Sequence, residues 1–175
     1  MKTKKVAFLG IMGALALVLG FLENLFIPDI PFLPVGAKPG LSNVVTMYVV
    51  SVWGFGGAIY ITLIKAMFAL ITRGTTAFFM SFCGGVFSTA VTCIILRWGK
   101  KHFSFWGTGV ASAVMHNMGQ LIAATIISGT FALLNYGKYL MVFSLITGSV
   151  TGIMLLMIVP RVERFSTIYK DNSKK

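Results

Sequence analysis

The segment from 107 to 128 constrains the fold most strongly, because it is apolar and rich in small residues yet carries His116, Asn117 and Gln120 near its midpoint. As a helix rising about 1.5 Å per residue it is roughly 33 Å long, which matches the ~30 Å hydrocarbon thickness of a bilayer. Its polar groups are then expected near mid-membrane, where such groups usually face a bundle interior, a cavity or a ligand.

The composition indicates a membrane protein along the whole chain. Of the 175 residues, 57% are hydrophobic and 11% are charged, and the mean hydropathy is +0.87, whereas about a quarter of the residues in a soluble domain are charged. We therefore expect one transmembrane domain, 1–175, with an all-α fold. The net charge of +11 does not predict nucleic-acid binding, because Lys and Arg lie in short connections and at both termini. It predicts contact with anionic lipid.

The number of spans depends on how the apolar run 41–71 is divided. The run is too long for one span and short for two, and a break in the glycine-rich stretch 53–57 gives six. With six spans, eleven Lys and Arg lie on the cytoplasmic side with both termini and three on the outer side, whereas five spans place the basic cluster 97–101 opposite the N-terminus, against the positive-inside rule. The predicted spans of this multi-pass cell-membrane protein are 6–26, 41–53, 54–71, 77–96, 107–128 and 139–159.

Prolines mark two further features. The segment 27–40 holds four of the five prolines and cannot form a regular helix, so we expect it to dip into the bundle as irregular backbone. The last span is expected to stop at Pro160.

Residues for catalysis or metal binding are scarce. No Asp-rich Mg²⁺ motif is present, and His102 and His116 lack further Cys or His residues at ligand spacing. The glycines at 54–57 join two spans and not a strand to a helix, which argues against a nucleotide loop. We expect no catalytic residue, no metal and no cofactor in this chain. Its four acids are Glu23, Asp29, Glu163 and Asp171.

Polar and basic groups converge on the outer half of the predicted bundle. Ser112, His116 and Gln120 are spaced by four and share one helix face, with Asn117 beside them. Lys65 is the one basic residue inside a span, and a lysine there needs a counter-charge or an anionic ligand.

Two interpretations of this cluster stay open. One is structural: Glu23 pairs with Lys65, and the polar groups of 107–128 bond to other helices. The other is a ligand pocket open to the outside, which we favour because three outer basic residues are balanced by only two acids. In the pocket interpretation, charge comes from Lys38, Lys65 and Arg73, and the floor is formed by His116, Asn117 and Gln120.

Four stretches, 36–50, 62–75, 82–88 and above all 110–124, resemble the Gx transporter family. That family is also labelled heptaprenyl diphosphate synthase component I and is similar to the substrate-binding S-components of energy-coupling factor (ECF) transporters. The most specific part is the HNMGQ run at 116–120. The resemblance also adds Asn43, at the end of the run that starts at Lys38, to the expected substrate-binding residues.

The resemblance implies an S-component bundle of six helices whose pocket is gated by the loops 27–40, 72–76 and 129–138. It also implies docking onto an ECF scaffold subunit driven by two ATPases, so that ATP is used by the partners. The implied ligand is a small anionic or amphipathic precursor, such as an isoprenoid, a quinone or a flavin-related compound. The positions implied for docking are Ala7, Gly10 and Ala14.

The sequence leaves one other function open and disfavours a second. A non-transporting membrane partner in a redox or quinone/isoprenoid synthesis complex stays open as the alternative. A prenyl synthase is disfavoured, because such an enzyme needs carboxylates to hold Mg²⁺ on the diphosphate and this chain lacks the motif.

Overall fold

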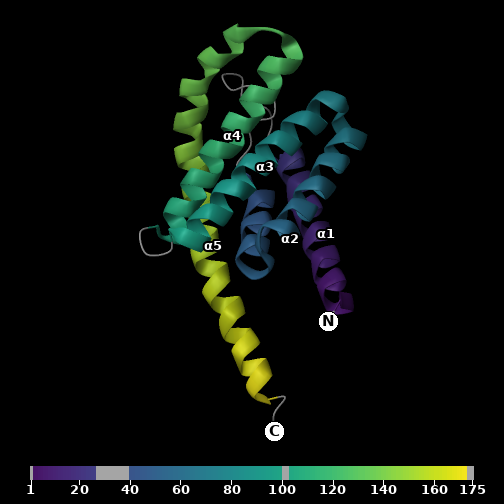
Figure 1. Ribbon diagram of the computed structural model, residues 1–175, viewed down its shortest axis with the longest axis vertical. Coiled ribbons are helices and arrows are strands. Elements are labelled where there is room, and N and C mark those ends of the chain that lie inside the picture. The colour runs from purple at the N-terminus through teal and green to yellow at the C-terminus, as the bar shows by residue number, and fades with distance from the viewer. Residues whose placement is uncertain (1, 27–39, 100–102, 173–175) are drawn as a thin grey trace.

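The computed structural model describes residues 2–26, 40–99 and 103–172, and within these ranges the chain is helical without strands (Figure 1). The five α-helices in the described part are long and apolar enough to cross a membrane. The expected all-α membrane fold is thus confirmed. The elements are α1 (Lys2–Phe26), α2 (Leu41–Arg73), α3 (Thr75–Trp98), α4 (Phe105–Ser128), the 3₁₀ helix η1 (Phe131–Tyr136) and α5 (Gly137–Asn172).

Helix α2 is a hairpin and not a rod. Its backbone leaves helical geometry at Gly54, where φ is 70° and ψ is −165°, a conformation that glycine adopts without a side-chain clash. Lys65 Nζ donates a 2.7 Å hydrogen bond to Asn43 Oδ1, although the two residues are 22 positions apart, which in a straight helix corresponds to roughly 33 Å. The halves therefore run antiparallel, so the five α-helices provide six helical segments, and the turn lies inside the stretch 53–57.

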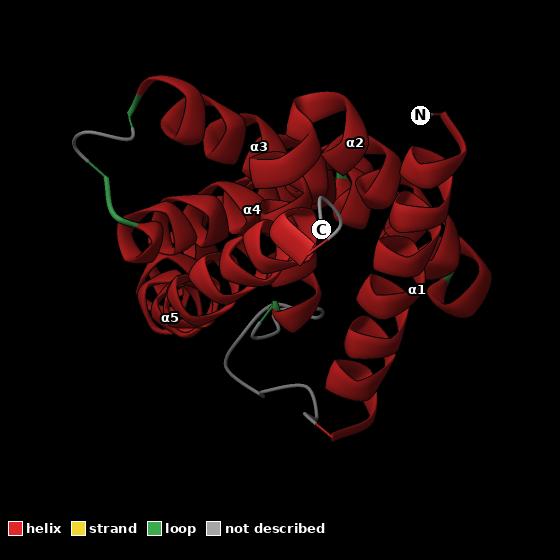
Figure 2. Cartoon of the chain, turned by 90° about the horizontal axis from the view of Figure 1, so that it is seen from below, coloured by secondary structure: helices red, strands yellow, loops and turns green. Residues whose placement is uncertain are grey.

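The helices pack mostly in chain order. Helix α3 lies between α2 and α4, and α4 also packs along α5. Among the described elements, α1 contacts α2 alone, and in Figure 2 it stands apart from α4 and α5. One side of the molecule is thus a tightly packed set of helices, and the other is a single helix held by one neighbour.

Glycines bring α4 and α5 into backbone contact. A Cβ added to Gly109 would collide with the backbone of Gly152, and one added to Gly148 would lie 2.5 Å from Val110 Cα. Small residues at a helix interface allow this close approach in membrane proteins. The polar residues of α4 therefore project from a rigid support.

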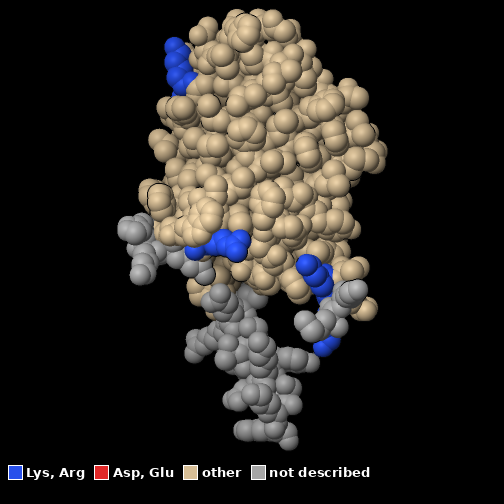
Figure 3. All heavy atoms as spheres, viewed as in Figure 1, with Lys and Arg blue, Asp and Glu red and all other residues tan. Residues whose placement is uncertain are grey.

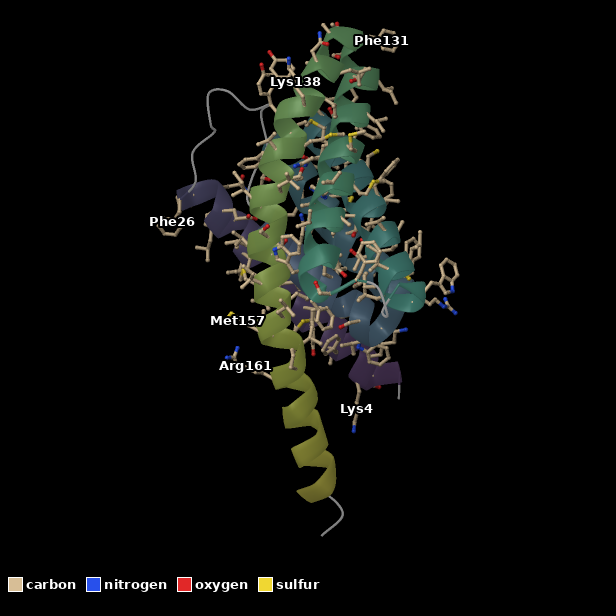
Figure 4. All side chains as sticks on the ribbon, turned by 90° about the vertical axis from the view of Figure 1, so that its left-hand side faces the viewer. Lys4, Phe26, Phe131, Lys138, Met157 and Arg161 are labelled. Carbon is tan, nitrogen blue, oxygen red and sulfur yellow. The ribbon has the colours of Figure 1, made fainter. Side chains whose placement is uncertain are left out.

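Both termini lie at one end of the molecule, at the bottom of Figure 1, and the α2–α3 and α4–α5 connections lie toward the other. Lys4 and Arg161 mark the first end and Phe131 and Lys138 the second (Figure 4). On the face shown in Figure 3, basic side chains lie near these two ends and leave the middle uncharged. On this face the basic side chains thus lie toward the ends, as expected for a bundle that crosses a bilayer.

The structure corrects one predicted boundary and extends several others by a few residues. The last helix does not stop at Pro160 but continues to Asn172 with this proline inside it. Proline removes only one backbone donor, and α5 keeps polar contacts there, because Arg161 Nη1 donates a 3.0 Å hydrogen bond to the Met157 carbonyl. Helices α3 and α4 each begin two residues earlier than predicted, and α3 ends two residues later. The predicted dip of 27–40 lies outside the described residues, except for Gly40.

Candidate functional site

A cavity of about 340 Å³ lies among α1, α2, α3 and α4. This volume is at the lower end of the range for small-molecule pockets, which is about 300–1,000 Å³. Its wall combines polar groups with apolar surface. The lining residues are Ala16, Leu17, Gly20, Glu23, Asn24, Gly40, Ser42, Asn43, Lys65, Phe68, Arg73, Thr76, Ala77, Met80, Ser81, His116, Asn117 and Gln120.

The structure brings six of the seven predicted site residues to this one cavity. The seventh, Lys38, lies outside the described residues. That these six bind a substrate stays a prediction; that they share one wall is an observation. The six are Asn43, Lys65, Arg73, His116, Asn117 and Gln120.

Lys65 and Glu23 both line the cavity, but their hydrogen bonds go to different groups. Lys65 Nζ donates to Asn43 Oδ1 at 2.7 Å. Glu23, which is only 4% exposed, accepts a 2.6 Å hydrogen bond from the backbone N–H of Leu41. This bond joins the last turn of α1 to the first turn of α2, where an unpaired backbone N–H needs an acceptor and a negative charge is favoured. The two charges therefore also organise the cavity wall.

The α4 side of the cavity is formed by His116, Asn117 and Gln120. The Asn117 amide donates from Nδ2 to the Ser144 hydroxyl of α5 at 2.7 Å. His116 Nδ1 is buried and has no hydrogen-bond partner among the residues that the structure describes. A buried polar atom without a partner costs free energy, so the ring is suited to meet a water molecule or a ligand group.

A glycine on α3 makes room for these side chains. A Cβ on Gly84 would lie 2.8 Å from Gln120 Cγ and 2.9 Å from the carbonyl oxygen of His116. A Cβ on Gly119 would in turn lie 2.8 Å from the carbonyl oxygen of Cys83. The α3–α4 contact therefore depends on glycine at both positions, and it holds the polar face of α4 against the cavity.

Ser112, which shares the helix face of His116 and Gln120, does not line the main cavity. It lines a separate void of about 10 Å³ together with His116, Asn117 and Thr147. Such a volume is about that of one water molecule as a probe measures it. The predicted helix face is thus divided between a ligand-sized cavity and a water-sized one.

Sequence reasoning missed several polar residues of the wall. Thr76 and Ser81 on α3 and Ser42 on α2 line the cavity. Serine and threonine are common in membrane helices, so their presence in the sequence does not indicate a binding site. Thr76 and Met80 are one turn apart and share a helix face, but only the position of α3 beside α4 shows that this face is inward.

The described residues contain no group of three or more His, Cys, Asp or Glu side chains that could together hold a metal ion. Cys83 and Cys93 are free thiols. The chemistry that the site offers is thus hydrogen bonding and charge, supplied mainly by amide, imidazole, amine and guanidinium groups.

The family described as heptaprenyl diphosphate synthase component I has a model that matches residues 12–158. The chain belongs to this family. Comparison with curated proteins gives no match. Among solved structures, this family member is similar to the S component of a bacterial ECF transporter. The TM-score is 0.67 and the sequence identity is 18%, and the match covers 94% of this chain and 98% of that one. The family resemblance and the S-component fold are thereby confirmed, and this family member is a multi-pass membrane protein.

Proposed function

We propose that the chain is the substrate-binding membrane subunit of an ECF-type transporter, and that the 340 Å³ cavity holds a small anionic or amphipathic precursor. The observation that carries the proposal is the convergence of Lys65, Arg73, His116, Asn117 and Gln120 on one ligand-sized cavity within an S-component fold. These five residues come from two helices, α2 and α4, that are separate in the sequence. A cavity with several converging polar groups is the usual form of a ligand site.

The charge and the apolar wall of the cavity support this ligand class. Among the described lining residues, two cations, Lys65 and Arg73, face one acid, Glu23, which favours an anionic group. Leu17, Phe68 and Met80 supply an apolar surface for the rest of the ligand. An isoprenoid, quinone or flavin-related precursor has this combination.

Binding and transport explain the site better than prenyl synthesis does. The one described carboxylate of the cavity, Glu23, already accepts the Leu41 N–H, whereas a prenyl synthase needs several carboxylates for Mg²⁺. A seven-unit prenyl chain is also large for a cavity of about 340 Å³. We therefore propose a non-enzymatic role.

The proposal includes an orientation and partners. The termini lie on the cytoplasmic side with anionic lipid, and the cavity is reached from outside. A scaffold subunit with two ATPases supplies the energy, and Ala7, Gly10 and Ala14 form the docking positions. These three residues are exposed on α1, and a Cβ on Gly10 would meet nothing within 4 Å, so this surface is accessible to a partner.

Native mass spectrometry of the protein purified from its own membranes tests the proposal. We expect a retained small molecule in the wild type and its loss in K65A and in H116A, while both variants elute as folded protein. K138A is the matched control, because Lys138 lies over the Tyr139 ring at the far end and does not line the cavity.

Two results contradict the proposal. Retention of the ligand in both K65A and H116A rules out the cavity as its site. Purification of the wild type without ligand and without scaffold or ATPase subunits, but with enzymes of a redox or quinone/isoprenoid pathway, supports the alternative of a non-transporting membrane partner.

A further inference from the structure

Ser144 of α5 contacts a residue of the cavity wall and makes two short hydrogen bonds. It is fully buried and does not line the cavity. Its Oγ donates to the carbonyl oxygen of Leu140 at 2.6 Å and lies 2.7 Å from Nδ2 of Asn117 on α4. Ser144 is therefore the link between α5 and a residue of the cavity wall.

The protons of this pair determine how the Asn117 amide is oriented. A serine hydroxyl has one proton to donate, and that of Ser144 goes to the Leu140 carbonyl. Ser144 Oγ can then only accept from Asn117. The amide group that faces it must be the NH₂ and not the carbonyl, because two acceptors at 2.7 Å repel each other. The opposite amide orientation would place two acceptors against each other and is therefore disfavoured.

With its NH₂ held by Ser144, Asn117 keeps a carbonyl oxygen that can accept a hydrogen bond and has no partner among the described residues. The residue is 6% exposed and lines the cavity. Its Nδ2 bond to Ser144 is its one side-chain hydrogen bond within the described chain, and its Oδ1 is not among the fully enclosed atoms that lack a partner. The wall thus offers an acceptor at Asn117, on another helix from the cationic donor Lys65.

We infer that Ser144 is a specificity-determining residue that acts through Asn117, and that the ligand carries a hydroxyl or N–H donor in addition to its anionic group. This inference rests on the proposed function, because it concerns the same cavity. The ligand class becomes a small anionic amphipath with a donor placed to reach α4. The hydrocarbon of a prenyl diphosphate has no such donor.

Two probe compounds that differ in one hydroxyl test the inference. The affinities of para-hydroxycinnamate and cinnamate are measured by titration calorimetry on the full chain in lipid nanodiscs, with empty nanodiscs subtracted. We expect the wild type to bind the hydroxylated probe about three- to tenfold more tightly, the value of one net hydrogen bond. In S144A the ratio falls toward one, because the freed amide can turn, and in S144T it is restored.

S149A is the matched control. Ser149 lies on the same helix and makes the same kind of bond, from its Oγ to the Leu145 carbonyl at 2.6 Å, but it is only half-buried and does not line the cavity. We expect S149A to keep the wild-type ratio. A purely structural role of Ser144 would weaken both probes equally and leave the ratio unchanged.

The outcomes separate the two proposals. If the wild type binds both probes equally, or if S144A keeps the preference, the inference about Ser144 is wrong while the anion site stands. If the wild type binds neither probe, the proposed site for an anionic amphipath is itself contradicted, and with it the inference that the ligand carries a hydrogen-bond donor. Should S144A fail to fold, S144C replaces it, because a thiol is a much weaker hydrogen-bond partner for the Asn117 amide than a hydroxyl; an unchanged preference for the hydroxylated probe in S144C would overturn the inference.

Discussion

The carboxylate of Glu23 illustrates how much one residue can do at the edge of the cavity. It accepts the Leu41 N–H at the start of α2, and the N-cap residue Gly40 has no side chain that could do so. The same first turn holds Asn43, which accepts from Lys65. Glu23 on α1 thus holds the first turn of α2, and Asn43 in that turn accepts the hydrogen bond of the Lys65 amine.

We predict that E23A destabilises the protein by about 1–3 kcal/mol, the cost of a buried donor left without a partner, and that E23Q loses less, because its amide oxygen can still accept from Leu41. Thermal unfolding in detergent measures both. Equal losses in the two variants would show that the charge of Glu23 matters and the hydrogen bond does not.

At this scale the sequence predicts the residues that polarity makes conspicuous. Lys65, His116, Asn117 and Gln120 stand out because such groups are costly inside a membrane span, and all four line the cavity. The roles of Glu23 and Ser144 were not predictable, because each depends on a backbone or side-chain partner from a neighbouring helix. Which helices are neighbours is a property of the tertiary structure.

At the scale of elements, the α4–α5 contact is the most demanding one. Three glycines place the two backbones against each other, and the Asn117–Ser144 bond crosses the same interface. The stiffness of this contact is what gives the α4 wall a fixed orientation.

We predict that G148A lowers stability by about 1–3 kcal/mol through overpacking, because its Cβ would lie 2.5 Å from Val110 Cα and 3.0 Å from the carbonyl oxygen of Gly109. G10A is the control: nothing lies within 4 Å of its Cβ. Thermal unfolding of the two variants makes the comparison, and an equal melting temperature for G148A and wild type would mean that α5 can shift freely on α4.

Element boundaries were predictable to different degrees. The turn within 53–57 followed from glycine content and charge bias, two signals that agree. The end predicted at Pro160 was wrong, because a proline acts only on the local backbone and α5 continues beyond it. The 3₁₀ helix η1, which precedes α5 directly, has no distinctive pattern and appears only in the structure.

At the scale of the whole molecule, the two ends of the bundle differ. The termini share one end, and the η1 region with Lys138 is at the other (Figure 4). The positive-inside rule predicts that the end with the termini faces the cytoplasm.

We predict that a membrane-impermeant maleimide labels T130C in intact cells but labels S104C only after permeabilisation. Both positions are exposed and lie at opposite ends of α4. The background is a chain with Cys83 and Cys93 replaced by alanine, since both thiols are free. The reverse labelling pattern would invert the orientation, and with it the side from which the cavity is reached.

The hairpin of α2 has a consequence for biosynthesis. Its first half, 41–53, is only about 20 Å long and cannot span a bilayer of ~30 Å by itself. The lysine of its second half is hydrogen-bonded to the asparagine of its first, so neither half is complete in lipid without the other. We therefore expect the two halves to enter the membrane together, after the ribosome has synthesised the chain at least to Lys65.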